Sequence, residues 1–352
     1  MDGIAAAGIR ASFDARTGLL ESFTVADRGR EVAPLHRAPW VGTDEAMPPE
    51  AAPHLATLGG DFFCAPFGGH EGGSPLHGWP PNAAWAVVAQ GGATLRAVLG
   101  RPVMGATLVK ELAVADGHPF VYQRHVFIGG EGRVAFANHA NVAVRGGAHI
   151  RTSAKRRWET PGTPLETDPA RGRSALRYPA QATDPRAFPG LAGPVDLTTY
   201  PWATRHEDFV AGIEAAGATF GWTAVTRKGA GDLYLSLRDP RRVPMTMLWH
   251  SDGGRDYAPW SGRHFGCLGV EEGAAHALLG LSSEADLAGP GALALRPGGI
   301  AEVRHVIGAI AWPTEEPVAE VTLDGDAIRV RGEAGAEREL PIRAAFLTEP
   351  TR

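Results

Sequence analysis

Cysteine is scarce in this sequence, with only Cys64 and Cys267 among 352 residues. Two cysteines so far apart give no disulfide framework, and neither has the closely spaced partners of a zinc-binding motif. Sparse cysteine is typical of a reducing compartment. We therefore expect both thiols to be small buried hydrophobic groups, and we predict no metal site.

Basic charge and long apolar runs are lacking as well. The formal net charge of -5 provides no positive field for nucleic acid or for an anionic membrane surface. No apolar run approaches the roughly 20 residues of a membrane-spanning helix, and the N-terminus lacks the basic start of a secretory signal. We expect a cytoplasmic protein that binds neither nucleic acid nor membrane, of an oligomeric state that the sequence does not indicate.

Short runs rich in β-branched and aromatic residues dominate the chain. Those at residues 106–114, 120–128 and 134–144 follow one another across Asp-Gly and Glu-Gly turns. No helical segment long enough for a βαβ crossover separates them, so strands should pair antiparallel. We predict an all-β fold, a large antiparallel β-sandwich in one domain spanning residues 1–352. Further runs support it, at residues 9–13, 19–25, 93–99, 219–226, 233–237, 243–250, 265–271, 300–310 and 318–330.

Two segments interrupt this pattern. Residues 207–215 predict a short helical turn, and residues 155–157 (Lys-Arg-Arg) fit either a solvated surface or a binding site for an anionic group such as phosphate.

The glycine- and proline-rich stretch at residues 59–85 carries five Phe and Trp residues on a backbone that must turn repeatedly. A regular helix or central strand is not expected there. Aromatic rings on such a backbone suit a concave site where sugars can stack, although a loop that tucks its rings into the core would look similar.

Three polar residues stand in otherwise apolar or glycine-rich surroundings: His77, His139 and Glu271. Histidine exchanges protons near neutral pH, and a half-buried carboxylate can be tuned into a base, so the set is equipped for general acid/base catalysis. A histidine in a strand is also commonly a satisfied core residue. Glu272 is the rival base, and only one of two neighbours in a strand can face a site.

The order of these motifs resembles the aldose 1-epimerase (galactose mutarotase-like) family. The likeness lies in the loop at residues 65–69, the His-Gly-aromatic motif at 76–79 with Trp85 downstream, the Asn-His-Ala-Asn segment at 138–141, the strand ending in Glu271, and the Leu-Arg-Pro-Gly-Gly stretch at 295–299. It implies a β-supersandwich and interconversion of the α and β anomers of a sugar without a cofactor. By position, Glu271 resembles the base, His139 the acid, and His77 a second histidine near the ring oxygen.

The pocket candidates beside the motifs are Phe67, His70, Trp79, Asn82, Asn141, Trp249 and Arg263. The family's usual arginine is missing, and either Asn82 or Arg37 is a candidate to replace it. The missing arginine affects which sugar the protein would accept, and the sequence does not identify that sugar. A different class of function, a non-catalytic sugar-binding or sugar-sensing protein on the same fold, stays open beside the epimerase, as does a polysaccharide lyase on a related sandwich.

Overall fold

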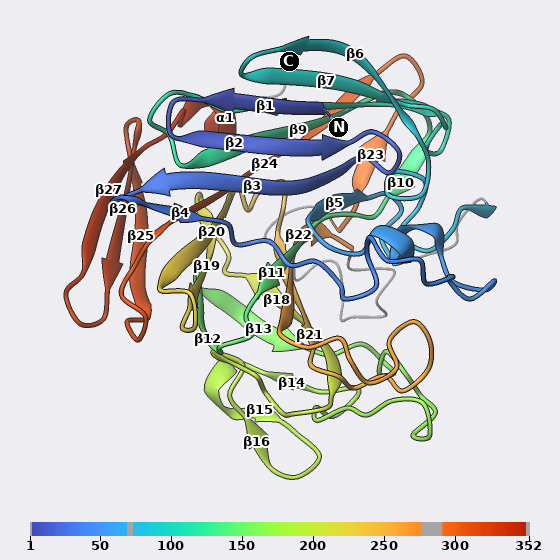
Figure 1. The fold of residues 1–352 in the computed structure, drawn as a ribbon, viewed down its shortest axis with the longest axis vertical. Helices are drawn as coiled ribbons and strands as arrows, with labels where there is room; N and C mark the ends of the chain where they lie inside the picture. The colour runs from blue at the N-terminus through green and yellow to red at the C-terminus, as the bar shows by residue number, and fades with distance from the viewer. Residues whose placement is uncertain (1, 69–72, 276–290, 350–352) are drawn as a thin grey trace.

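Antiparallel strands make up the protein almost entirely. The structure is a computed structural model that describes residues 2–68, 73–275 and 291–349, with 51% strand and 4% helix. Two large sheets form its body (Figure 1). The predicted all-β sandwich is confirmed, and every pairing between the named strands is antiparallel.

The first sheet has 11 strands. In spatial order they are β1 (Asp2–Ala6), β2 (Ile9–Asp14), β3 (Leu19–Asp27), β5 (Asp61–Cys64), β11 (Phe136–Ala143), β22 (Cys267–Ala274), β21 (Met245–Ser251), β18 (Glu207–Glu214), β13 (Lys155–Glu159) and β14 (Gln181–Ala182), with β4 (Arg30–Val32) paired to β3.

The second sheet has nine strands. Their order is β17 (Thr199–Tyr200), β12 (Ala148–Thr152), β19 (Gly221–Arg227), β20 (Asp232–Arg238), β24 (Ile300–Ala311), β9 (Phe120–Gly129), β8 (Ala106–Ala113), β7 (Thr94–Leu99) and β6 (Trp85–Gly91).

The remaining elements are small and lie outside the two large sheets. They are the pair β10 (Gly132–Val134) and β23 (Leu293–Leu295), the pair β15 (Phe188–Pro189) and β16 (Pro194–Val195), the sheet of β25 (Val318–Asp324), β26 (Ala327–Gly332) and β27 (Glu337–Pro341), the helix α1 (Ala345–Thr348), and the 3-10 turns η1 (Pro53–Thr57) and η3 (Pro185–Ala187).

Three apolar layers follow from the alternation of side chains along the strands. The largest fills the space between the two sheets, where Phe63, Val142 and Leu248 meet Tyr234 and Ile307. A second layer lies on the far face of the nine-stranded sheet, beneath β25–β27 and α1. The third lies on the outer face of the 11-stranded sheet, and loops rather than strands cover it. That third layer holds the candidate site.

Two predictions of local structure are wrong. Residues 207–214 form the strand β18, not a helical turn, and all eight of its residues are buried. A strand buried on both faces reads as a continuous apolar run, which periodicity alone does not distinguish from a helix. Within the glycine-rich stretch, residues 61–64 form β5, a central strand between β3 and β11.

Only the middle residue of the basic segment at 155–157, Arg156, is exposed to solvent. The Lys155 side chain is 2% exposed, and its Nζ lies 2.8 Å from Oε2 of Glu214. Arg157 is buried beside Glu159, with Nε 3.2 Å from Oε2. Both predictions are therefore wrong for Lys155, which belongs to a polar network between the sheets.

Within the described residues, no helix has the length and apolar character that crossing a membrane requires.

Candidate active site

A cavity of about 220 Å³ opens on the outer face of the 11-stranded sheet. Strands β5, β11, β18, β21 and β22 form its floor, and segments at residues 54–58, 67–68, 76–77, 161–165 and 255–260 form its walls. Its lining combines apolar rings with a few polar groups, as ligand pockets do. The lining residues are His54, Leu55, Leu58, Phe62, Phe67, Gly68, Leu76, His77, His139, Pro161, Leu165, Phe209, Trp249, Arg255, Trp260 and Glu271.

His139 and Glu271 meet on the floor because strand register places them opposite each other on β11 and β22. Nε2 of His139 lies 3.1 Å from Oε1 of Glu271, and both side chains are buried. Nδ1 of His139 makes no hydrogen bond within the described chain. The pair is thus a hydrogen-bonded acid and base at the cavity floor.

Burial sets the protonation of this pair. It raises the pKa of Glu271 well above its ordinary value and lowers the pKa of His139 to about 3, with a smaller contribution from His54. Both changes favour the uncharged forms. These shifts favour a pair that holds one proton, with the carboxyl group donating to Nε2 of the imidazole.

Glu272 faces the opposite side of β22 because neighbours in a strand alternate. Its carboxylate accepts hydrogen bonds from Thr223 (2.7 Å) and Thr246 (2.9 Å) between the two sheets. It has no access to the cavity, so Glu271 is the carboxylate of the site.

His77 reaches the cavity from a strained turn. Its φ is 67°, in the left-handed region that non-glycine residues rarely adopt. Gly78 follows at φ 76°, where a Cβ would lie 2.0 Å from the carbonyl oxygen of Ala65. Only glycine fits at that position. The His77 ring lies edge-on to His139, with 5.7 Å between ring centroids.

Asn82 holds this turn instead of lining the cavity. Its Nδ2 donates to the carbonyl oxygens of Leu76 (2.8 Å) and Gly78 (2.6 Å). Its Oδ1 accepts the backbone N–H of His54 at 2.8 Å. Asn82 thereby fixes two cavity histidines relative to each other and acts as a positioning residue.

Aromatic rings surround the acid/base pair. Phe62 stacks on His139 with 4.4 Å between centroids, and Phe67 lies 5.4 Å from His77. Trp249 crosses His139 edge to face at 5.9 Å, and its indole N–H donates to Oε2 of Glu207 at 2.9 Å. The predicted contacts Phe67 and Trp249 therefore both face the cavity.

Two polar cavity residues, His54 and Arg255, were not predicted from the sequence. His54 lies on η1, and burial lowers its pKa to about 4. The guanidinium carbon of Arg255 lies 4.5 Å from the centroid of Trp260 and 6.0 Å from that of Trp249. Its Nε makes no hydrogen bond within the described chain. Its position after the glycines at 253–254 was the only signal in the sequence.

The other predicted contacts lie outside the lining. Trp79 packs at the edge of the inter-sheet core beneath Arg101, whose guanidinium carbon is 5.0 Å from its ring. Asn141 is buried and donates to the carbonyl oxygens of Gly59 and Gly60.

Arg263 pairs with Glu45 at 2.5 Å, and Arg37 lines a separate surface pocket beside Gly42. Neither replaces the missing arginine at the cavity. His70 falls outside the described residues.

Comparisons with known proteins support the fold. No family model and no curated protein sequence matches the chain. A structure from Escherichia coli K12, provisionally named aldose 1-epimerase, has 12% identity and a TM-score of 0.59 over 87% of this chain and 97% of its own.

Two further structures agree. A galactose mutarotase-like protein from Lactobacillus casei has 11% identity and a TM-score of 0.57 over 88% of this chain and 99% of its own. A galactose mutarotase related enzyme from Lactobacillus acidophilus has 11% identity and a TM-score of 0.53 over 92% and 99%. The fold is that of the galactose mutarotase-like proteins.

Proposed function

We propose that the protein is an aldose 1-epimerase-type isomerase that interconverts the α and β anomers of a sugar. The observation that carries this proposal is the hydrogen-bonded pair of His139 and Glu271, 3.1 Å apart, buried at the floor of a ring-lined cavity. Mutarotation needs one base and one acid on the same anomeric centre, and general acid/base catalysis of this kind needs no other reagent.

The pair can supply both functions without changing its proton count. Transfer of the shared proton gives a Glu271 carboxylate and a protonated His139. The carboxylate then removes the proton of the anomeric hydroxyl while His139 protonates the ring oxygen. The bond between C1 and the ring oxygen breaks, and C1 becomes a carbonyl. Rotation about C1–C2 and reversal of the same transfers close the ring as the other anomer.

The remaining lining would bind and orient the sugar. Rings such as Phe67 and Trp249 offer flat apolar surfaces to a pyranose face. His77, opposite His139, would hydrogen-bond near the ring oxygen. Arg255 is the cavity's guanidinium, and it would bind a carboxylate or phosphate group of an acidic sugar.

Anomer exchange measured by NMR at equilibrium tests the proposal. The exchange rates of a panel of neutral, phosphorylated and acidic aldoses are measured with the wild type, E271Q and H139Q, in a buffer that itself catalyses little exchange. We expect acceleration for at least one sugar, lowered about 10²- to 10⁴-fold in either variant because each removes one proton-transfer group. E111Q, on β8 of the other sheet, is the matched control and should keep the full rate. Full activity in E271Q would overturn the assignment.

The mainly apolar lining also favours a second function, that of a sugar-binding protein without turnover. Saturable binding of a sugar to the wild type, with no faster anomer exchange for any sugar in the panel, would establish that function instead.

A further inference from the structure

A second group of polar side chains lies behind Trp249, outside the cavity lining. Nitrogens of His36 and His264 and the sulfur of Cys267 all lie within 4.8 Å of one another, and all three residues are buried. No other group of at least three potential ligands this close occurs in the part of the chain that the structure describes. The histidines face each other through their Nε2 atoms, 3.1 Å apart.

Hydrogen bonds fix which nitrogen of His264 is free for a ligand. The Ser251 hydroxyl donates to Oε1 of Glu207 at 2.6 Å. The same hydroxyl oxygen lies 2.6 Å from Nδ1 of His264 and so accepts its proton. Nε2 of His264 therefore presents a lone pair towards His36. Metal-binding histidines are commonly oriented in this way by a hydrogen-bonded carboxylate.

The burial of the group suits coordination. His36 is 8% and His264 1% exposed, so an ion bound between their rings would be shielded from bulk water. The thiol of Cys267 has only a long contact, 3.8 Å to Oδ1 of Asn141. A hydrogen bond at that length contributes little to holding the thiol in place.

We propose that His36, His264 and Cys267 bind a divalent transition ion of the zinc type. Two imidazoles and a thiolate select such ions over Mg²⁺ or Ca²⁺, which prefer oxygen. With usual bond lengths, tetrahedral ligand atoms lie roughly 3.3 to 3.6 Å apart, so small side-chain movements complete the site. Binding forms the metal–sulfur bond and releases the thiol proton to solvent, and the proton on Nε2 of His36 moves to its Nδ1 so that both Nε2 atoms can coordinate. Water takes the fourth position.

The ion would have a structural role next to the cavity. His36 precedes β5, whereas His264 ends the loop that carries Arg255 and Trp260, and Cys267 begins β22. An ion shared by the three segments would tie this wall of the cavity to the sheet. The His264 ring also stacks on Trp249, with 5.6 Å between centroids and 14° between ring planes. The proposal does not depend on the epimerase function, because it predicts metal binding with or without turnover.

Cobalt(II) substitution of the tag-free, chelator-treated full chain tests the site. We expect one Co²⁺ per chain, a thiolate-to-cobalt charge-transfer band in the near ultraviolet, visible bands of tetrahedral Co²⁺, and displacement by one equivalent of Zn²⁺. A wild-type protein without the charge-transfer band, or with no stoichiometric binding, would overturn the proposal.

The other cysteine supplies the matched control. Since the chain contains only Cys64 and Cys267, a band that persists in C64S is assigned to Cys267 even if C267S does not fold. We expect C267S to lose the band and H36Q to bind Zn²⁺ at least 10-fold more weakly. Retention of the band in a folded C267S, or its loss in a folded C64S, would contradict the assignment.

Discussion

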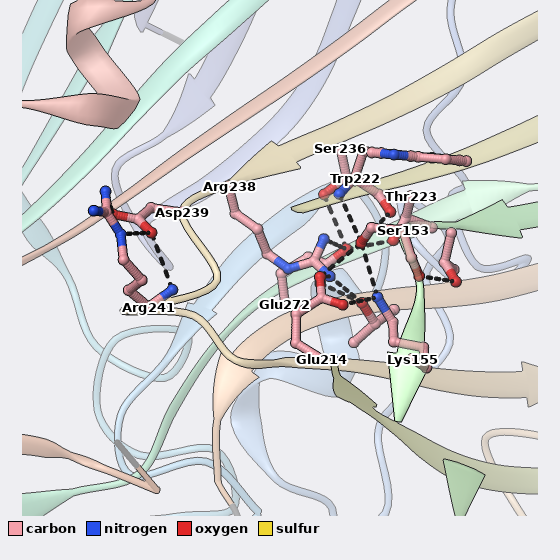
Figure 2. Close-up of polar contacts among 12 residues, drawn as sticks. Ser153, Lys155, Glu214, Trp222, Thr223, Ser236, Arg238, Asp239, Arg241 and Glu272 are labelled. Atoms are coloured by element: carbon pink, nitrogen blue, oxygen red, sulfur yellow. Dashed lines mark hydrogen bonds and ion pairs between the residues drawn. The ribbon is translucent and has the colours of Figure 1, made fainter. Parts of the chain in front are cut away.

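Arg238 and Glu272 form an ion pair that is closed off from solvent, with Nη1 3.0 Å from Oε1 and both side chains fully buried. Figure 2 shows the network to which they belong. Nη2 of Arg238 also contacts Glu214 at 2.8 Å, and Lys155 binds the second oxygen of that carboxylate. The two adjacent glutamates of β22 thus have separate roles. Glu272 binds the two sheets together, whereas Glu271 faces the cavity.

Loss of this guanidinium should be strongly destabilising. R238M leaves two buried carboxylates with Lys155 as their single cation, and removing one partner of a buried pair typically costs about 3 to 5 kcal/mol of unfolding free energy. Urea denaturation measures the effect. R241M is the control because the Arg241 side chain is 57% exposed and pairs with Asp239 at the surface; its cost should stay below about 1 kcal/mol. Equal costs for the two variants would contradict the structural role of Arg238.

The pH dependence of anomer exchange should report the shared proton of the catalytic pair. The His139 pKa, about 3, lies below the ordinary value for histidine, and the Glu271 pKa lies above that of a free carboxyl group. The pair therefore takes up a second proton only well below the usual histidine pKa. We expect kcat/KM to show no acid limb near that pKa and to fall only as more acidic solution adds the second proton. An acid limb centred near the ordinary histidine pKa of about 6.5 would contradict this account.

The fold could be predicted because local sequence patterns mark where its strands begin and end. Alternating side chains at residues 106–114 and Asp-Gly turns such as Asp324-Gly325 predict hairpins locally, and the structure has hairpins there. β18 was misread because all of its residues are buried. β5 was missed because it has only four residues between glycine-rich turns.

Only the parts of the site that depend on short motifs, or on the alternation of side chains between the two faces of a strand (strand parity), could be predicted. Parity indicated that Glu271 and Glu272 point to opposite faces, and the structure agrees. Neither motif nor parity specifies which loops fold over the outer face of a sheet. Arg255 and His54 reach the cavity through such loops, whereas Arg263 and Trp79 turn away through contacts that form only in the folded chain.

Arg255 should determine the preference for acidic sugars. A charge-assisted hydrogen bond contributes about 1.5 to 3 kcal/mol, so R255Q should weaken binding of a carboxylated or phosphorylated aldose roughly 10- to 100-fold. A neutral aldose should be affected much less. Isothermal titration with an acidic sugar and its neutral counterpart measures the difference. R263Q removes an arginine that pairs with Glu45 outside the lining and should change neither affinity. If R255Q lost the same affinity for the acidic and the neutral sugar, the proposed contact between Arg255 and the anionic group would be contradicted.

Buried His250 should make the protein less stable in mild acid. Burial lowers its folded-state pKa to about 3, whereas the unfolded chain has an ordinary histidine pKa near 6.5. Its contribution is complete above about pH 6.5 and is lost as the pH falls towards 3, because only the unfolded state takes up the proton.

H250Q isolates this contribution. Glutamine stays neutral and can still accept the backbone N–H of Trp202, which lies 3.2 Å from Nε2 in the wild type. Between about pH 7.5 and pH 5, the wild type should lose about 2 kcal/mol more unfolding free energy than H250Q. Urea unfolding of both proteins at the two pH values measures this double difference, in which the other titrating groups cancel. Parallel losses in the two proteins would mean that His250 is already protonated in the folded state.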